Sequence, residues 1–228
     1  MTEISRPRFP FDIVGFDLDG TLLDTTADLA AAVNHALASA GRATLTIDQV
    51  RPMVGGGGRH MLAQGMAATG GCTDDELDAL LQRLLAYYEE HIADLTRPFP
   101  GALAALDRLA EVGVKLAIVT NKRERLARLV LGQLRLTGRF ATIIGGDRLG
   151  DGRGKPARDL IDLMIEECGG GRAAFVGDTV YDVEAARNAG ISVVTFNPGF
   201  PDMPTGDLGA DAVIDHYDAL IPTLERLG

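Results

Sequence analysis

Short apolar runs alternate with helical patterns along most of this chain, and that alternation limits its possible folds more than any other feature. The runs at 13–16, 115–120, 141–146, 173–178 and 191–196 predict buried strands, with 211–214 as a weaker sixth. Helical patterns occupy 101–112, 122–136, 156–168 and 180–189. Such alternation is typical of a parallel sheet covered by helices. The sequence therefore predicts an α/β fold with a doubly wound parallel sheet, a Rossmann-like core.

Residues 24–96 break this alternation, because they carry helical signals and no convincing strand. Thr25 or Thr26 could cap a first helix. The segment 73–76, Thr-Asp-Asp-Glu, fits a capping box that opens a longer, leucine-rich helix. Residues 97–101 fit a return hinge with two prolines. We therefore expect a core of residues 1–23 and 97–228 with an inserted all-helical cap of residues 24–96.

Composition and charge argue against several classes of partner. A net charge of -10 disfavours nucleic acid, which would need a broad basic face. No apolar run approaches the roughly 20 residues that span a bilayer, and the first ten residues lack the apolar region of a secretory signal. Cys72 and Cys168 show no zinc or disulfide spacing. We expect a cytoplasmic protein without membrane or nucleic-acid partners, and make no prediction of its oligomeric state.

Polar residues follow four of the predicted strands, at the edge where open parallel sheets bind ligands. The first strand leads into Asp17-Leu18-Asp19-Gly20-Thr21, and the second into Thr120-Asn121. Gly154-Lys155-Pro156 follows the third strand after a loop. The fourth leads into Gly177-Asp178, with Asp182 four residues further on. One such string could be an ordinary turn, whereas four in this order indicate a site for phosphate and metal chemistry.

These motifs resemble those of the haloacid dehalogenase superfamily, specifically its phosphatase branch. Asp17-Leu18-Asp19-Gly20-Thr21 matches the first motif, and Thr120, Lys155 and Gly177-Asp178 with Asp182 match the second, third and fourth. The resemblance covers nearly the whole chain, with the helical insertion where subclass I members carry their cap. Within the superfamily, residues 17–34 and 54–62 look like those of bacterial phosphoglycolate phosphatases.

The resemblance implies a role for each motif residue in the hydrolysis of a phosphate monoester. Asp17 would be the nucleophile that forms an aspartyl-phosphate. Asp19 would protonate the leaving oxygen and later activate water. Magnesium (Mg2+) would bind Asp17, the backbone carbonyl of Asp19 and Asp178. Thr120 and Lys155 would stabilise the transferred phosphoryl group.

Further residues are candidates for supporting roles. Asp182 could orient Lys155 or a metal-bound water, or could simply be a favourable charge in the first turn of a helix. Gly57, Gly58 and Arg59 could bind a substrate carboxylate through glycine amides and a guanidinium, or could belong to a flexible connector. A separate pair, Thr21 and Asn121 of the first two motifs, completes the candidates for substrate contact.

Lysines and aspartates separate this chain from other branches of the superfamily. Dehalogenases lack the second aspartate of the first motif, which is present here as Asp19. Phosphonoacetaldehyde hydrolases and sugar-phosphate mutases need a lysine in the cap, and residues 24–97 contain none. The expected substrate is a small anionic phosphate ester, first of all 2-phosphoglycolate. Two other substrates stay open: another small phosphate ester, such as a sugar phosphate, and pyrophosphate. A phosphate-sensing module without enzymatic activity also stays open.

Overall fold

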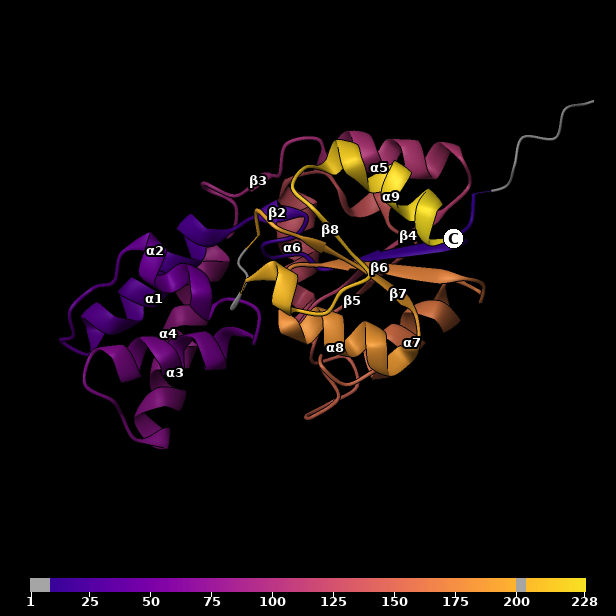
Figure 1. The fold of residues 1–228 in the computed structure, drawn as a ribbon. Coiled ribbons are helices and arrows are strands. Elements are labelled where there is room, and N and C mark those ends of the chain that lie inside the picture. The colour runs from indigo at the N-terminus through magenta and orange to yellow at the C-terminus, as the bar shows by residue number, and fades with distance from the viewer. Residues whose placement is uncertain (1–8, 200–203) are drawn as a thin grey trace, which may run out of the picture.

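A computed structural model describes residues 9–199 and 204–228. Its centre is a six-stranded parallel sheet with the strand order β5-β4-β1-β6-β7-β8. The strands are β1 (Ile13–Phe16), β4 (Lys115–Val119), β5 (Thr142–Ile144), β6 (Ala173–Gly177), β7 (Ser192–Phe196) and β8 (Ala212–Ile214). Each coincides with a predicted apolar run. Helices cover both faces of the sheet, which confirms the doubly wound α/β fold (Figure 1).

Two apolar clusters fill the space between the sheet and its helices. Three helices pack into the first cluster: α5 (Ala102–Glu111), α6 (Glu124–Gln133) and α9 (Leu220–Leu227). Two pack into the second: α7 (Asp159–Glu167) and α8 (Val180–Ala189). In β1, Val14 and Phe16 contribute to the first cluster and Ile13 to the second, because successive side chains of a strand point to opposite faces. The central strand is therefore buried on both sides.

Residues 24–96, which lie between β1 and α5, are mostly helical, and Figure 1 shows them beside the sheet in violet. They contain four α-helices: α1 (Thr26–Ser39), α2 (Ile47–Val50), α3 (Gly58–Ala68) and α4 (Asp74–Glu90). We refer to residues 24–96 as the cap segment. Its ends meet in a feature that the sequence analysis did not predict, a short antiparallel pair of β2 (Leu23–Asp24) with β3 (Arg97–Pro98). Strands of two residues carry no periodic pattern from which they could be predicted.

A buried carboxylate ties the two ends of the cap segment together. Asp28 of α1 accepts hydrogen bonds from the amide of Leu95 at 3.1 Å, the amide of Thr96 at 2.9 Å and the Thr96 hydroxyl at 2.7 Å. Asp28 is 3% exposed. Because Thr96 directly precedes β3, this carboxylate fixes the point at which the chain returns to the sheet.

Local details differ from the sequence predictions at several helix starts. Thr25 is the N-cap residue of α1, but its side chain makes no capping bond; Oδ1 of Asp24 instead accepts from the amide and hydroxyl of Thr26 at 3.2 and 2.8 Å. Of the capping box predicted at 73–76, one bond is present among the described residues: Oγ1 of Thr73 accepts from the Glu76 amide at 3.3 Å. Helix α7 begins at Asp159, three residues later than the predicted 156.

Two parts of the chain that the sequence analysis discussed lie outside the residues that the structure describes. These are the first eight residues and residues 200–203, the start of the tail to which no role was assigned. Within residues 9–199 and 204–228, none of the helices is long and apolar enough to cross a bilayer.

Candidate active site

The site lies at the carboxyl edge of the sheet, where the strand order changes direction. Strand β1 pairs with β4 on one side and β6 on the other, so the connections leave it in opposite directions. Asp17 follows β1, Thr120 follows β4, and Asp178 follows β6. In open α/β sheets, ligands bind at such a topological switch point. The fold thus brings these three residues to one edge of the sheet, although Asp17 and Asp178 are 161 positions apart in the chain.

A buried lysine bridges two of the carboxylates. Lys155, on the loop after β5, places Nζ 2.8 Å from Oδ1 of Asp17 and 2.5 Å from Oδ1 of Asp182. Its side chain is 2% exposed. Burial alone would lower the pKa of Lys155, but the two carboxylates outweigh burial and hold this pKa above its ordinary value. The ammonium therefore stays charged next to Asp17.

The first turn of α8 fixes the carboxylate of Asp182. Its Oδ2 accepts from the amides of Asp178 and Thr179 at 3.1 and 3.0 Å, and from the Thr179 hydroxyl at 2.8 Å. Gly177 makes this close approach possible, because a Cβ there would lie 2.3 Å from Cβ of Asp182. Asp182 thus contacts Lys155 from a position that the first turn of α8 holds in place.

Three buried carboxylates, those of Asp17, Asp178 and Asp182, have oxygens that all lie within 4.8 Å of one another. We call them the carboxylate cluster. Burial raises the pKa of Asp17 from 3.8 to about 6, although the Lys155 ammonium opposes this rise. One ammonium against three carboxylates leaves an excess of negative charge in a buried site. Clustered carboxylate oxygens with excess negative charge are what a hard divalent cation requires.

Neighbouring hydroxyls orient the third carboxylate of the cluster. Thr21 is fully buried and donates its hydroxyl to Oδ1 of Asp178 at 2.6 Å. The hydroxyl of Tyr217 in turn donates to the backbone carbonyl of Thr21 at 2.8 Å. The hydroxyl proton of Thr21 is therefore engaged by Asp178, so the residue predicted to contact substrate acts in this structure as a support for the carboxylate cluster.

Lys122 is a site residue that the sequence analysis missed. Its Nζ lies 2.7 Å from both carboxylate oxygens of Asp19 and 4.7 Å from the centre of the Tyr88 ring of α4. Burial lowers the pKa of Lys122, but Asp19 and Tyr88 together outweigh burial and keep this pKa above its ordinary value. Two signals could have identified Lys122: the chain has only three lysines, and this one directly follows Thr120-Asn121.

The two residues after β4 hold loops in place. Oγ1 of Thr120 accepts from the Lys122 amide at 3.2 Å, and Thr120 is 2% exposed. The side-chain amide of Asn121 donates to the carbonyls of Gly55 at 3.1 Å and Lys155 at 3.0 Å. Asn121 therefore joins the cap segment to the Lys155 loop. The side-chain amide of Asn121 already donates two hydrogen bonds, so the predicted contact with substrate would compete with them.

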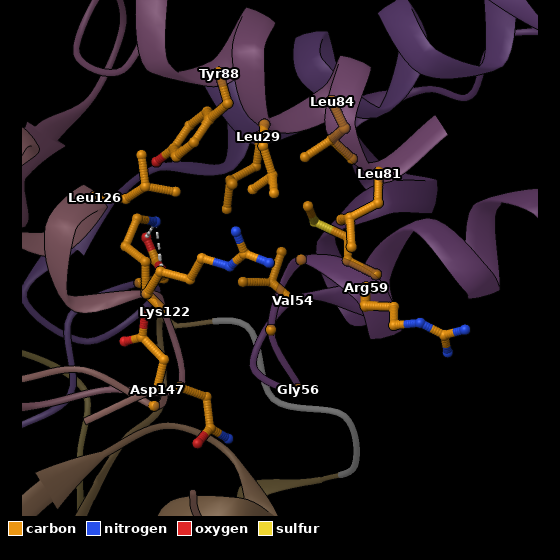
Figure 2. A pocket seen from close by; sticks show the side chains of 18 of the residues that line it. Leu29, Val54, Gly56, Arg59, Leu81, Leu84, Tyr88, Lys122, Leu126 and Asp147 are labelled. Atoms are coloured by element: carbon orange, nitrogen blue, oxygen red, sulfur yellow. Dashed lines mark hydrogen bonds and ion pairs between the residues drawn. The ribbon is translucent and has the colours of Figure 1, made fainter. Parts of the chain in front are cut away.

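A cavity of about 230 Å³ separates the sheet edge from the cap segment (Figure 2). Asp19 and Lys122 line its core side. Apolar side chains line most of the cap side: Leu29, Val54, Met61, Leu81, Leu84, Leu85 and Tyr88. Gly57 is the N-cap residue of α3, and Gly57 and Gly58 also line the cavity. The structure thus brings the predicted glycine amides to the same space as the acid–base candidate Asp19.

Arg59 differs from the two glycines that precede it. Its side chain turns away from the centre of the cavity in Figure 2. The guanidinium pairs with Asp74 at 3.1 Å and with Asp78 at 3.0 Å, both on α4. Half of the Arg59 side chain is exposed. The predicted contact between Arg59 and a substrate carboxylate would require this residue to leave two acidic partners.

Comparison with known proteins agrees with the fold. The family model described as haloacid dehalogenase-like hydrolase matches residues 14–196. A protein of Agrobacterium fabrum named phosphoglycolate phosphatase is 40% identical over 223 residues, covering 96% of this chain and 94% of the relative. One of Caulobacter vibrioides with the same name is 39% identical over 207 residues, covering 90% and 86%.

A solved structure with a similar fold is also described as a phosphoglycolate phosphatase. The crystal structure of a predicted phosphoglycolate phosphatase from Haemophilus somnus superposes with a TM-score of 0.87 at 26% identity, covering 94% of this chain and 98% of that one. The chain therefore belongs to the haloacid dehalogenase-like hydrolases. Within them it is a phosphatase, as its relatives and its complete set of motif residues agree.

Proposed function

We propose that this phosphatase hydrolyses 2-phosphoglycolate to glycolate and phosphate, with Mg2+, in the cytoplasm. The observation that carries the proposed chemistry is the position of Asp17, which lies at the switch point in ion-pair contact with Lys155. The names of the relatives support the substrate. There are two alternative substrates: another small phosphate ester, such as a sugar phosphate, or pyrophosphate. Either would use the same reacting groups.

The reaction would proceed in two displacements on phosphorus. In the first, a carboxylate oxygen of Asp17 forms a bond to phosphorus while the ester P–O bond breaks, and Asp19 gives a proton to the leaving oxygen. In the second, Asp19 takes a proton from water, whose oxygen displaces Asp17 and releases phosphate. Lys155 and Thr120 would offset the charge of the phosphoryl oxygens throughout.

Lys122 adds a condition to this scheme. Asp19 can act as an acid only when it carries a proton, and in this structure both of its oxygens contact the Lys122 ammonium. The negative charge of an incoming phosphate ester would draw Lys122 towards the substrate and loosen that contact. We therefore propose that Lys122 both orients Asp19 and helps to bind the substrate.

The residues present fit a divalent cation at the carboxylate cluster. Three buried carboxylates face a single lysine, and burial holds the pKa of Asp17 at about 6. Asp17, Asp178 and the backbone carbonyl of Asp19 would hold Mg2+, which prefers such oxygen ligands. When bound, the metal would neutralise charge on the phosphoryl group. Asp182 is engaged by Lys155 and by the first turn of α8, so we assign it to orienting Lys155.

The test is phosphate release from a panel of 2-phosphoglycolate, sugar phosphates and pyrophosphate, with Mg2+ and then with EDTA. Release that depends on Mg2+ and strongly favours 2-phosphoglycolate would support the proposal in full. Metal-dependent release that favours another ester would keep the chemistry and replace the substrate. Asp17→Asn is the matched control, because the amide cannot form the aspartyl-phosphate; near-normal activity in this variant would show that Asp17 is not the nucleophile.

A further inference from the structure

Three cationic side chains from the described part of the chain line the cavity between the sheet edge and the cap segment: Arg59, Lys122 and Arg123. Two of them already have acidic partners, since Lys122 pairs with Asp19 and Arg59 with residues of α4. Arg123 is exposed, and across residues 9–199 and 204–228 its guanidinium has no hydrogen bond or ion pair. Among the described residues, it is therefore the cation of this cavity that can bind an incoming anion without leaving an acidic partner.

The backbone of Arg123 holds the side chain beside the reacting groups. Arg123 is the N-cap residue of α6, and its carbonyl accepts from the amides of Leu126 and Ala127 at 2.9 and 3.0 Å. The preceding residue is Lys122, which is anchored on Asp19. The Cα of Arg123 is thus fixed from both sides, one residue away from the partner of the proposed acid.

The proposed function places the leaving group in this cavity. Asp19 gives its proton to the leaving oxygen, so the leaving group has to lie next to Asp19. Asp19 lines the cavity, whereas Asp17 and Asp178 lie outside its lining. The phosphoryl group would therefore sit at the carboxylate cluster and the leaving group would extend towards Arg123. In 2-phosphoglycolate the carboxylate is attached to the carbon that bears the ester oxygen, so it enters the same cavity.

Much of the remaining cavity wall is apolar, so a cation is a favourable partner for a carboxylate that enters the cavity. Apolar side chains such as Leu84 and Leu126 offer no hydrogen bond, and a carboxylate without one is costly to bury. Two acidic residues, Asp147 and Asp151, also line the cavity, but no ion pair joins either to Arg123 in the part of the chain that the structure describes. Oδ1 of Asp147 accepts instead from the Glu124 amide at 2.8 Å.

We propose that Arg123 binds the carboxylate of the substrate and determines the preference of this enzyme for carboxylated phosphate esters. This inference rests on the proposed function. It assigns to Arg123 a role for which Arg59 was one candidate in the sequence analysis. A guanidinium suits the task because its planar donors match a carboxylate in two parallel hydrogen bonds. The flanking apolar side chains strengthen that contact by keeping water away from it.

The experiment compares 2-phosphoglycolate with 2-hydroxyethyl phosphate, which has the same two-carbon skeleton and a hydroxymethyl group in place of the carboxylate. For Arg123→Ala we expect kcat/KM on 2-phosphoglycolate to fall roughly 10- to 100-fold, as for the loss of a charged hydrogen bond. On 2-hydroxyethyl phosphate it should change less than about threefold. Arg83→Ala is the matched control: Arg83 is an exposed arginine of α4 outside the cavity lining, so both substrates should be unaffected.

The outcomes separate this inference from the proposed function. A wild-type enzyme without preference for 2-phosphoglycolate over 2-hydroxyethyl phosphate would overturn the proposed substrate, and the inference with it. A wild-type preference that survives in Arg123→Ala would overturn the inference alone. An equal loss on both substrates would do the same, because Arg123 would then not read the carboxylate. A selective loss in Arg59→Ala instead would assign the carboxylate to Arg59.

Discussion

Both carboxylate oxygens of Asp19 lie 2.7 Å from Nζ of Lys122, although the two residues are 103 positions apart in the chain. The ring of Tyr88, from the cap segment, covers the same ammonium. The side chains of Lys122 and Asp19 are 6% and 11% exposed, so water screens this pair little. One contact thus couples the acid–base candidate, the loop after β4 and the cap.

Removing Lys122 should therefore affect stability as well as turnover. In Lys122→Met, Asp19 stays buried without its cation, and we expect the free energy of unfolding to fall by about 3 kcal/mol in urea titrations. The double variant Lys122→Met/Asp19→Asn should regain most of that loss, because the amide carries no charge. A single variant as stable as the wild type would show that the pair contributes orientation only.

The raised pKa of Asp17 predicts a pH-dependent stability of the metal-free protein. The folded state holds this proton up to a pKa of about 6, against an ordinary value of 3.8. The folded state therefore binds more protons between these values, and stability falls as the pH rises through this window. In EDTA, the loss should amount to about 1–3 kcal/mol. Asp17→Asn should flatten this slope and be the more stable protein at pH 8; an unchanged slope would contradict the prediction.

Metal binding should be visible without turnover. If Mg2+ binds the carboxylate cluster of the folded state, saturating metal should raise the melting temperature by about 5 °C. Asp178→Asn removes a proposed ligand and should abolish this shift. Asp78→Asn is the control, since Asp78 lies on α4 with an exposed side chain and should leave the shift in place. A shift that persists in Asp178→Asn would locate the metal elsewhere.

Asp28 should stabilise the junction between the cap segment and the core. Its carboxylate accepts from the amides of Leu95 and Thr96 and from a hydroxyl, all next to β3. Asp28→Ala leaves these donors without their acceptor, and we expect a loss of about 2–4 kcal/mol in unfolding free energy. Glu111→Ala, at an exposed helix end, should change it by less than about 0.5 kcal/mol. Similar losses in both variants would deny Asp28 a special role.

Residues that directly follow buried strands could be placed from the sequence. Asp17, Thr120 and Asp178 each end an apolar run, and parallel strands bring such ends to one edge. Lys155 follows its strand only after a loop, so its assignment depended on the family resemblance. Its contact with Asp17 results from the tertiary structure, because no local pattern relates residues on different strands.

The side chains that fill the cap side of the site could not be placed in this way. Lys122 resembles any solvated lysine until the fold brings Asp19 to it. Arg59 adjoins a run of glycines that suggests an anion site, yet the packing of α3 against α4 presents it with Asp74 and Asp78. Ion pairs between distant segments depend on how helices pack, which periodicity does not encode.

The short β2–β3 pair has a consequence for how such a protein could be assembled. Leu23 pairs with Pro98 and Asp24 with Arg97, so the helical segment leaves and re-enters the core through adjacent residues. If a tight turn replaced the cap segment and joined β2 directly to β3, the strands of the six-stranded sheet could keep their register. We therefore expect that the cap segment could be exchanged for another helical segment, and the substrate range changed with it, without rebuilding the carboxylate cluster.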